Sequence, residues 1–341
     1  MQVVVAGAGV AGLCCALELA ERGASVQVLE RGATLGAQSC SWYAGGMLAP
    51  WCELETAEPL VARLGQESLR WWSARIASVA RHGTLVVAHG RDEPELARFA
   101  RRTGQAAPGR YAWLDAEGIA ALEPDLAGRF RKALLFNDEG HLEPRAALHS
   151  LADRLHQAGV PIRFGVTADS QDTADADHVV DCTGLAARAA LADLRGVKGE
   201  MLVLRSRDIA FRRPIRVLHP RWPLYLVPRG EDRIMVGATT IESDDVRVTA
   251  RSVLELLGAA HAVHPALGEA DIVEIGAQAR PAFPDNLPRL RLRGRTLYVN
   301  GLYRHGFLLA PALARMTAQV LLEGKRFAEV MDENSREWRL A

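Results

Sequence analysis

Hydrophobic and polar positions in the first thirty residues follow the pattern of a strand, a helix and a second strand. Residues 2–6 are apolar, largely β-branched and bounded by glycine, which is typical of a buried parallel strand. Apolar residues then recur at helical spacing over residues 10–22, with a polar side, and Gly23 is a natural helix terminator. Residues 25–29 are again strand-like and lead into Glu30. The pattern therefore predicts a βαβ unit at the start of the chain.

A glycine motif lies at the turn between the first predicted strand and the helix. In the GxGxxG pattern of Gly7, Gly9 and Gly12, the first glycine permits a tight turn and the second lets a pyrophosphate approach. The third glycine allows close helix–strand packing, and the helix N-terminus offers N–H groups to the phosphates. Glu30 ends the second strand, where a carboxylate can accept hydrogen bonds from a ribose and would repel a 2′-phosphate. The motif predicts a dinucleotide site and argues against NADP, but it leaves FAD and NAD both open.

Helical and strand-like stretches alternate through the rest of the chain. Predicted helices cover residues 59–80, 93–102, 144–158, 252–261 and 311–323. Predicted strands cover residues 84–88, 161–164, 179–181, 201–205, 224–228, 234–238 and 296–300. The strand at 179–181 runs into a glycine turn at Gly184, like the first strand of the chain. Nucleotide-binding strands near both ends, with β-rich material between them, predict two interleaved domains.

Composition narrows the class of protein without identifying it. The chain has 341 residues, is 49% hydrophobic and 24% charged, and can therefore build a large core. Its 41 basic and 41 acidic residues cancel, so no basic surplus points to nucleic acid. Five scattered cysteines without a CxxC predict neither a disulfide framework nor a metal site, and they favour a reducing, cytoplasmic location. The longest apolar run, near the N-terminus, is shorter than a membrane span of about 20 residues.

Several further segments carry short motifs in a fixed order along the chain. They are 41–48, 141–144 (His-Leu-Glu-Pro), 197–201 (Val-Lys-Gly-Glu-Met), 225–229 (Tyr-Leu-Val-Pro-Arg), 234–239, 278–285 and the ending Gly-Leu-Tyr-Arg-His-Gly-Phe-Leu-Leu-Ala-Pro at 301–311. Together they span nearly the whole chain and resemble the D-amino-acid-oxidase-like flavoproteins, specifically the glycine oxidases of the thiamine pathway. The ending is the most diagnostic piece, because it is close to the family pattern G-H-[YF]-R-N-G-[IL]-x-L-A-P.

The resemblance implies an α/β fold and a non-covalently bound FAD. It predicts a Rossmann-like FAD-binding domain made of residues 1–75, 141–205 and 276–341. A smaller, β-rich α+β substrate-binding domain made of residues 76–140 and 206–275 would be interleaved with it. The positions implied to hold the cofactor are Gly7, Gly9, Val10, Ala11, Gly12, Glu30, Arg31, Cys40, Ser41, Gly45, Gly46, Met47, Val166, Gly184, Leu302, Tyr303, Arg304, His305, Gly306, Phe307 and Leu308.

Three residues are candidates for substrate binding and catalysis. Oxidation of an amino acid by a flavin requires the substrate to be held over the cofactor with its carboxylate neutralised. The planar fork of an arginine pairs with a carboxylate through two hydrogen bonds. By resemblance, Arg280 is this clamp, the hydroxyl of Tyr225 reaches the same carboxylate, and Arg304 lies beside substrate and flavin.

The resemblance implies oxidation of glycine to an imine, then glyoxylate and ammonia, with oxygen as acceptor and hydrogen peroxide as product. The imine could instead be handed to a thiazole synthase for thiamine synthesis. Another small amine such as sarcosine or a D-amino acid, an acceptor other than oxygen, and a flavin-binding protein without turnover remain open alternatives. Neither a nucleic-acid partner nor a membrane span is expected, and the sequence leaves open whether the chain forms a homo-oligomer.

Overall fold

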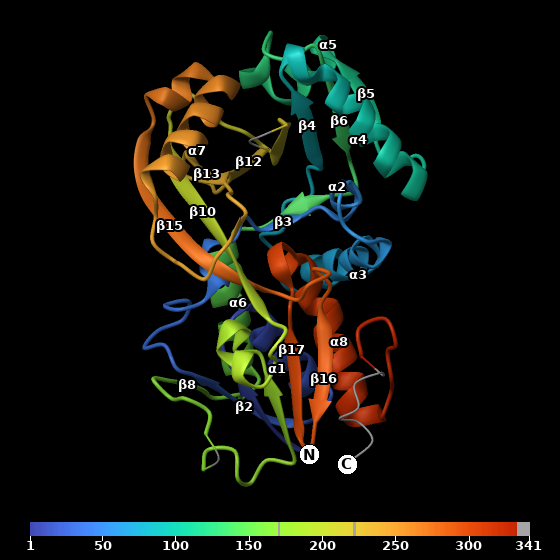
Figure 1. Ribbon diagram of the computed structural model, residues 1–341, viewed down its shortest axis with the longest axis vertical. Coiled ribbons are helices and arrows are strands. Elements are labelled where there is room, and N and C mark those ends of the chain that lie inside the picture. Colours follow the sequence, from blue (N-terminus) through green and yellow to red (C-terminus); the bar gives the residue numbers. More distant parts are fainter. Residues whose placement is uncertain (170, 221–222, 333–341) are drawn as a thin grey trace.

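The structure is a computed structural model that describes residues 1–169, 171–220 and 223–332. Two large sheets dominate it, one in the lower and one in the upper half of Figure 1. The helices are α1 (Val10–Glu21), α2 (Pro50–Glu53), α3 (Pro59–Arg75), α4 (Glu93–Ala106), α5 (Ala116–Leu122), α6 (Pro144–Gln157), α7 (Ala250–Val263) and α8 (Gly306–Glu323). Short 3-10 turns are η1 (Cys40–Tyr43), η2 (Gly90–Asp92), η3 (Pro124–Leu126), η4 (Gly184–Ala189), η5 (Pro265–Gly268) and η6 (Tyr303–His305).

The lower sheet contains the predicted βαβ unit. Its order is β16 (Arg289–Arg293), β17 (Thr296–Asn300), β9 (His178–Asp181), β1 (Gln2–Ala6), β2 (Ser25–Glu30) and β8 (Ile162–Phe164). All neighbours are parallel except β16 and β17. Because β1 lies between β2 and β9, the carboxyl ends of these three strands meet at one edge, where open α/β sheets bind their ligands.

The upper sheet is almost entirely antiparallel. Its order is β14 (Ile241–Glu242), β10 (Arg195–Arg205), β13 (Arg233–Gly237), β12 (Leu224–Pro228), β11 (Ile215–Leu218), β4 (Thr84–Ala88), β6 (Lys132–Phe136) and β5 (Ala112–Asp115). The long strand β15 (Asp271–Ala282) pairs with β10 along its whole length, and both run from the upper half toward the lower one (Figure 1). A two-stranded pair, β3 (Met47–Leu48) with β7 (Gly140–His141), lies between the halves.

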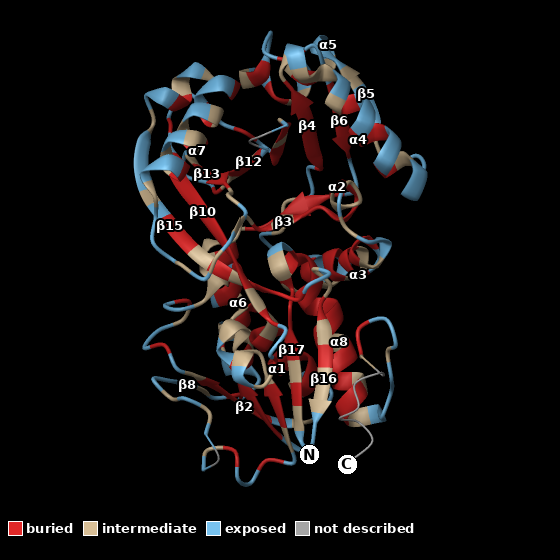
Figure 2. Cartoon of the chain, viewed as in Figure 1, coloured by how far each residue is buried: buried red, intermediate tan, exposed pale blue. Residues whose placement is uncertain are grey.

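Each large sheet has its own hydrophobic core, and most strands are red in the burial view of Figure 2. One core packs α1, α3, α6 and α8 with the lower sheet, and the other packs α7 onto the upper sheet. The predicted α/β class is therefore confirmed. The predicted domain boundary at 205 falls at the end of β10, and the one at 276 falls inside β15. Both strands pair in the upper sheet, although the prediction gave all of β10 and the second half of β15 to the FAD-binding domain. The division into two domains stays a prediction, and residues 333–341 of its last segment lie outside the described residues.

Two predicted elements differ from the observed ones in an informative way. The strand predicted at 201–205 is the second half of β10, and no strand was predicted where β15 lies. The last helix begins at Gly306 rather than at Pro311, so the proline lies inside α8. Proline has no N–H to donate to the carbonyl four residues before it, which is that of Phe307. That carbonyl instead accepts a hydrogen bond of 2.7 Å from Nε1 of the buried Trp72 on α3.

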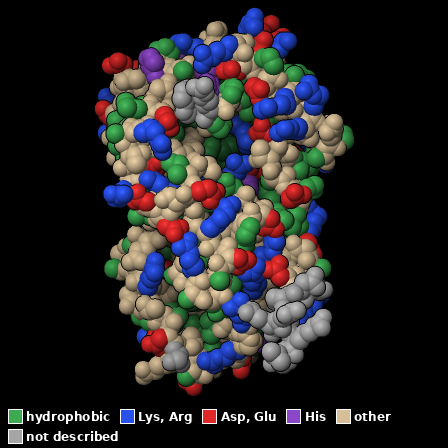
Figure 3. Space-filling view, in the orientation of Figure 1, with side chains coloured by type: hydrophobic (Ala, Val, Ile, Leu, Met, Phe, Trp, Pro, Cys, Tyr) green, Lys and Arg blue, Asp and Glu red, His purple; other side chains and the backbone are tan. Residues whose placement is uncertain are grey.

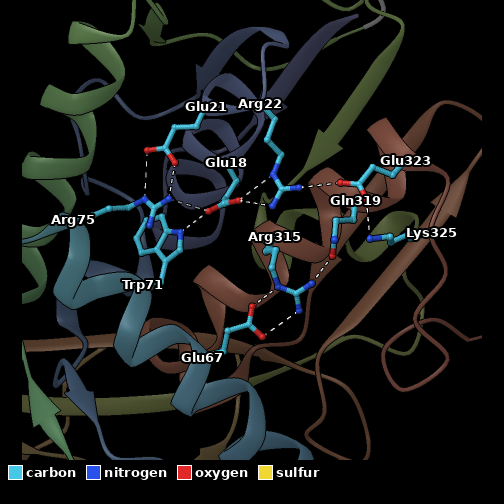
Figure 4. Close-up of polar contacts among 10 residues, drawn as sticks. All are labelled: Glu18, Glu21, Arg22, Glu67, Trp71, Arg75, Arg315, Gln319, Glu323 and Lys325. Atoms are coloured by element: carbon cyan, nitrogen blue, oxygen red, sulfur yellow. Dashed lines mark hydrogen bonds and ion pairs between the residues drawn. The ribbon is translucent and has the colours of Figure 1, made fainter.

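Polar contacts tie α1, α3 and α8 together on the outer side of this core (Figure 4). The buried carboxylate of Glu18 on α1 accepts hydrogen bonds from Trp71 and Arg75 of α3 and from Arg22. Arg22 also pairs with Glu323 at 3.1 Å, at the end of α8. Because Glu18 accepts from three side chains and Arg22 reaches both Glu18 and Glu323, these contacts link the three helices, although isolated surface pairs contribute little.

Candidate functional site

Two adjoining cavities, of about 170 and 310 Å³, lie between the two halves of the molecule and beside the edge of the lower sheet. They share part of their lining, so they form one elongated space. The shared lining residues are Val10, Cys40, Ser41, Gln278, Tyr303 and Gly306. We name the larger one the dinucleotide cavity and the smaller one the substrate cavity.

The dinucleotide cavity is built at the carboxyl ends of β1, β2 and β9. Gly7 follows β1 with a φ of +97°, a conformation that favours glycine, and a Cβ there would lie 2.8 Å from the Cys182 carbonyl oxygen. Gly9 precedes α1 and provides no capping side chain of its own, and the amide of Val10 donates to the Ser41 hydroxyl at 3.1 Å. The start of the helix, Val10 and Ala11, lines the cavity. A Cβ on Gly9 would approach the Ser39 hydroxyl oxygen to 3.0 Å, so the space in front of the helix depends on glycine.

These features fit the diphosphate of a dinucleotide, because the positive end of a helix and an open approach are what such an anion needs. Glu30 also lines the cavity, and its carboxylate accepts hydrogen bonds of 2.7 Å from the amides of Ala8 and Gly32. The carboxylate is thereby fixed beside the glycine turn, where a ribose hydroxyl could reach it.

The residues predicted to hold the cofactor lie around the two cavities, with one exception. Gly12 lines neither cavity, because it packs against the glycine turn, where a Cβ would lie 1.8 Å from the Gly7 carbonyl oxygen. In the dinucleotide cavity are Gly7, Gly9, Val10, Ala11, Glu30, Arg31, Cys40, Ser41, Val166, Gly184, Leu302, Tyr303 and Gly306. In the substrate cavity are Gly45, Gly46, Met47, Arg304, His305, Phe307 and Leu308, with the shared residues. Their roles toward the cofactor remain predictions.

A second helix N-terminus faces the same space. α8 begins at Gly306, its N-cap residue His305 makes no side-chain capping hydrogen bond, and Gly306 lines both cavities. Two long helices thus direct their positive ends toward the elongated cavity, at positions that the sequence places almost 300 residues apart. Such an arrangement stabilises negative charge in the cavity.

Arg280 lines the substrate cavity from β15. Its Nη1 donates a hydrogen bond of 3.2 Å to the Thr239 carbonyl oxygen. Among the described residues no carboxylate forms an ion pair with Arg280, so its charge is available to a ligand. The neighbouring strand makes room for it, because a Cβ on Gly199 of β10 would lie 1.9 Å from Arg280 Nη2.

Tyr225 lines the same cavity from β12 and is held between two glycines. A Cβ on Gly45 would lie 2.9 Å from its ring, and a Cβ on Gly237 would lie 2.8 Å from it. Burial raises the pKa of the Tyr225 hydroxyl, although the charges of Arg280 and Arg304 oppose the rise. The hydroxyl is therefore protonated near neutral pH and can donate a hydrogen bond.

Arg304 lines the substrate cavity but is already paired. Its Nη2 lies 2.7 Å from a Glu53 carboxylate oxygen and 2.8 Å from the Thr56 hydroxyl. Glu53 also accepts a hydrogen bond of 3.2 Å from Arg216, which reaches Glu55 at 3.0 Å as well. Two carboxylates thus balance two arginines, so Arg304 differs from Arg280 in having no free charge.

The carboxylate of Glu53 and the imidazole of His305 complete this group. Burial opposes ionisation of Glu53, but the charges of Arg304, His305 and Arg216 hold its pKa well below the usual range. Burial lowers the pKa of His305 to about 4, with only partial compensation from Glu53 3.6 Å away. Near neutral pH the carboxylate is therefore charged and the imidazole neutral.

Two residues that line the substrate cavity, Glu53 and Arg216, were not predicted from the sequence. Arg216 had a visible signal, since a charged residue interrupts the apolar strand β11. Glu53 had none, because it lies on the four-residue helix α2 and reaches the cavity only through the tertiary fold. Asp244 and Val246, which line the dinucleotide cavity, also lacked a signal in the sequence.

Three further observations concern metal ions, membranes and surface charge. Within residues 1–169, 171–220 and 223–332, no three His, Cys, Asp or Glu side chains are grouped so as to hold a metal ion. None of the helices described is both long and apolar enough to cross a membrane. Acidic and basic side chains intermingle over the face drawn in Figure 3, and all five cysteines are free.

Comparisons with known proteins agree with this geometry. The chain is 56% identical over 324 residues to the Rhizobium etli protein named as a thiamine biosynthesis oxidoreductase, ThiO, covering 94% of this chain and 97% of that one. It is 29% identical to the bifunctional protein ThiO/ThiG of Synechocystis, covering 95% of this chain but 52% of that protein. The crystal structure of glycine oxidase from Geobacillus kaustophilus superposes with a TM-score of 0.82 and 25% identity, covering 96% of each chain.

The family described as FAD dependent oxidoreductase, DAO, matches residues 2–320. This match covers both sheets and both cavities, and it confirms the resemblance found in the motifs. The chain therefore belongs to the DAO family of FAD-dependent oxidoreductases, and it is an enzyme that uses FAD.

Proposed function

We propose that this enzyme oxidises the amine of glycine. The observation that carries this proposal is the unpaired charge of Arg280 among the described residues. Arg280 lines the substrate cavity without an acidic partner among the described residues, whereas Arg216 and Arg304 are paired with Glu53. A cavity with one uncompensated positive charge favours a ligand with one carboxylate.

The side chains then have distinct tasks. The guanidinium of Arg280 binds the substrate carboxylate, and the protonated hydroxyl of Tyr225 donates a hydrogen bond to it. Fixing the carboxylate at two points orients the Cα–H bond, which is the main contribution a protein makes to such a reaction. The neutral imidazole of His305 adds no second positive charge to repel the amino group.

Oxidation to the imine removes a hydride from the Cα–H bond and a proton from the amino nitrogen, so that the Cα–N bond becomes a double bond. FAD, held in the two cavities, would supply the hydride acceptor, and oxygen would take up the two electrons and two protons as hydrogen peroxide. The balanced reaction is glycine, oxygen and water giving glyoxylate, ammonia and hydrogen peroxide. Water adds to the imine in the last step, and the amino nitrogen leaves as ammonia. Binding of FAD is proposed to be non-covalent, through the residues of the two cavities.

A role in thiamine synthesis is part of the proposal. It is supported by the 56% identity to a protein named for that pathway. The relative in which ThiO and ThiG are one chain suggests that the imine passes to a thiazole synthase. In that case the imine would be consumed by a condensation before water reaches it, and the released glyoxylate would fall.

An anaerobic titration tests the proposed activity. The yellow holoenzyme should be bleached by glycine and should recover its colour, with one equivalent of peroxide, when oxygen is admitted. A panel of sarcosine, D-alanine and L-alanine decides between glycine and the other small amines. Efficient bleaching by one of these amines but not by glycine would identify that amine as the substrate instead. Bleaching by neither glycine nor any of the three would contradict amino-acid oxidation.

A further inference from the structure

Two buried charged side chains stand on β10 outside the groups described above. Lys198 and Glu200 are 3% and 1% exposed, and their charged atoms lie 3.4 Å apart. Removing a lysine and a glutamate from water is costly unless every polar atom is satisfied. Their remaining hydrogen bonds therefore show which part of the chain the pair holds in place.

Most of those bonds go to one irregular segment, residues 243–249. The ammonium of Lys198 donates to the carbonyl of Arg247. One carboxylate oxygen of Glu200 accepts from the amide of Thr249 at 2.7 Å and from its hydroxyl at 3.1 Å. The other accepts from Ser252, on the helix that follows the segment. Although burial opposes ionisation, these bonds and the charge of Lys198 hold the pKa of Glu200 below its ordinary value.

The start of the segment is fixed to β10 and to η4. Ser243 forms a parallel bridge with Val197 of β10. The carboxylate of Asp244 receives two hydrogen bonds, of 2.5 and 2.9 Å, from the guanidinium of Arg188 on η4. Gly196 is required for this position, because a Cβ there would lie 1.9 Å from an Asp244 carboxylate oxygen.

Between these two attachments the segment passes over the dinucleotide cavity. Asp244 and Val246 both line that cavity, together with the glycine turn after β1 and the turn after β9. The segment therefore closes part of a space whose base is the nucleotide-binding edge of the lower sheet. No element of regular structure holds residues 244–249 in place, so their position depends on the side chains that bind them.

We propose that residues 243–249 form a strap that retains FAD, and that Lys198, Glu200 and Arg188 are positioning residues that hold the strap over the dinucleotide cavity. The motif Val-Lys-Gly-Glu at 197–200 then has a physical reason at each position. Val197 and the two charged residues hold the strap, and Gly199 leaves room for Arg280. The inference rests on the use of FAD and not on the identity of the substrate.

The test measures how fast FAD leaves the holoenzyme. Lys198→Met keeps the length of the side chain and removes the donor, and Arg188→Ala removes the bidentate bond from a side chain that is 41% exposed. Each variant should release FAD about tenfold faster on dilution, as followed by flavin fluorescence, which is the factor expected for one charge-assisted hydrogen bond. Because Arg188 is partly exposed, Arg188→Ala can still be measured if the substitution of the buried Lys198 impairs folding.

The strap itself offers a matched control. Arg247 supplies its backbone carbonyl to Lys198, and its side chain, 86% exposed, pairs with Asp245 of the same segment and not with β10 or η4. Arg247→Ala should therefore leave both attachments of the strap in place and release FAD at the wild-type rate. Hydrogen exchange gives the second readout. In Lys198→Met the amides of residues 244–249 should exchange faster, while those of β13 should not change. Equal FAD release from Lys198→Met, Arg188→Ala and Arg247→Ala would overturn the proposal, whatever the substrate proves to be.

Discussion

The guanidinium of Arg280 occupies the space that a side chain on Gly199 would need, since a Cβ at Gly199 would lie 1.9 Å from Nη2 and 2.2 Å from Cζ. The two residues lie on the paired strands β15 and β10. Arg280, on which the proposed function rests, can thus occupy its position only because residue 199 on the neighbouring strand has no side chain.

Gly199→Ala should therefore displace Arg280 while leaving the cofactor site intact. A misplacement of about 1 Å can cost roughly a hundredfold in rate, so we expect kcat/KM for glycine to fall by about tenfold to a hundredfold. FAD content should match wild type. Gly258→Ala on α7 is the control, because nothing lies within 4 Å of a Cβ at that position. A Gly199→Ala enzyme with wild-type kcat/KM would show that the position of the Arg280 guanidinium next to Gly199 is not needed for turnover of glycine.

Arg280→Lys tests the geometry of the clamp rather than its charge. Lysine keeps the positive charge but loses the planar fork that pairs with a carboxylate through two bonds. The loss should be about 1.5–3 kcal/mol, or roughly tenfold to a hundredfold in kcat/KM for glycine. Turnover of an amine without a carboxylate should change little, since it has nothing for the guanidinium to bind.

Arg304→Lys is the comparison for this variant. Because Arg304 is bound to Glu53 and Thr56, its replacement should lower kcat/KM less than that of Arg280. The opposite order of the two effects would place the substrate carboxylate at Arg304.

The sequence was most informative where function depends on local geometry. The glycine turn at Gly7 and the carboxylate of Glu30 lie within one βαβ unit, so spacing alone placed both at the cavity. The substrate side is different. Glu53 and Arg216 meet only because α2 and β11 pack near each other, and no periodicity along the chain encodes such a meeting. Pro311 misled the prediction of α8, because the carbonyl it leaves unpaired finds its donor in Trp72, from a distant helix.

Trp72→Phe should show how much that donor contributes. It would leave the buried Phe307 carbonyl without its hydrogen bond, which costs about 1–3 kcal/mol. We expect a lower urea midpoint and weaker protection of the first turn of α8 in hydrogen exchange. Trp71→Phe is the neighbouring control, because Trp71 is only half-buried and donates to Glu18, which has other donors. Equal destabilisation by the two substitutions would argue against a special role for the Phe307 carbonyl.

Glu139 gives the stability of the protein a pH dependence with a defined sign. Its carboxyl group is fully buried, and one oxygen accepts hydrogen bonds of 2.8 Å from the amides of Trp51 and Cys52. The other oxygen has no hydrogen-bond partner among the described residues. Burial raises the pKa of Glu139 to about 7, despite these hydrogen bonds. In the unfolded chain the group has an ordinary pKa of about 4.3.

A folded-state pKa above the unfolded one means that this group stabilises the fold most at low pH. The contribution is complete below about pH 4 and is lost as the pH rises toward 7, by roughly 2–3 kcal/mol between pH 5 and 8. Glu139→Gln keeps the acceptor for Trp51 and Cys52 but cannot ionise. Its free energy of unfolding, relative to wild type, should therefore increase by that amount over the same range, as measured by urea denaturation of the FAD-free protein. Glu117→Gln, which removes a carboxyl group at an exposed position on α5, is the matched control for the substitution itself. Parallel pH profiles for Glu139→Gln and wild type would mean that the buried carboxyl does not change its ionisation on folding.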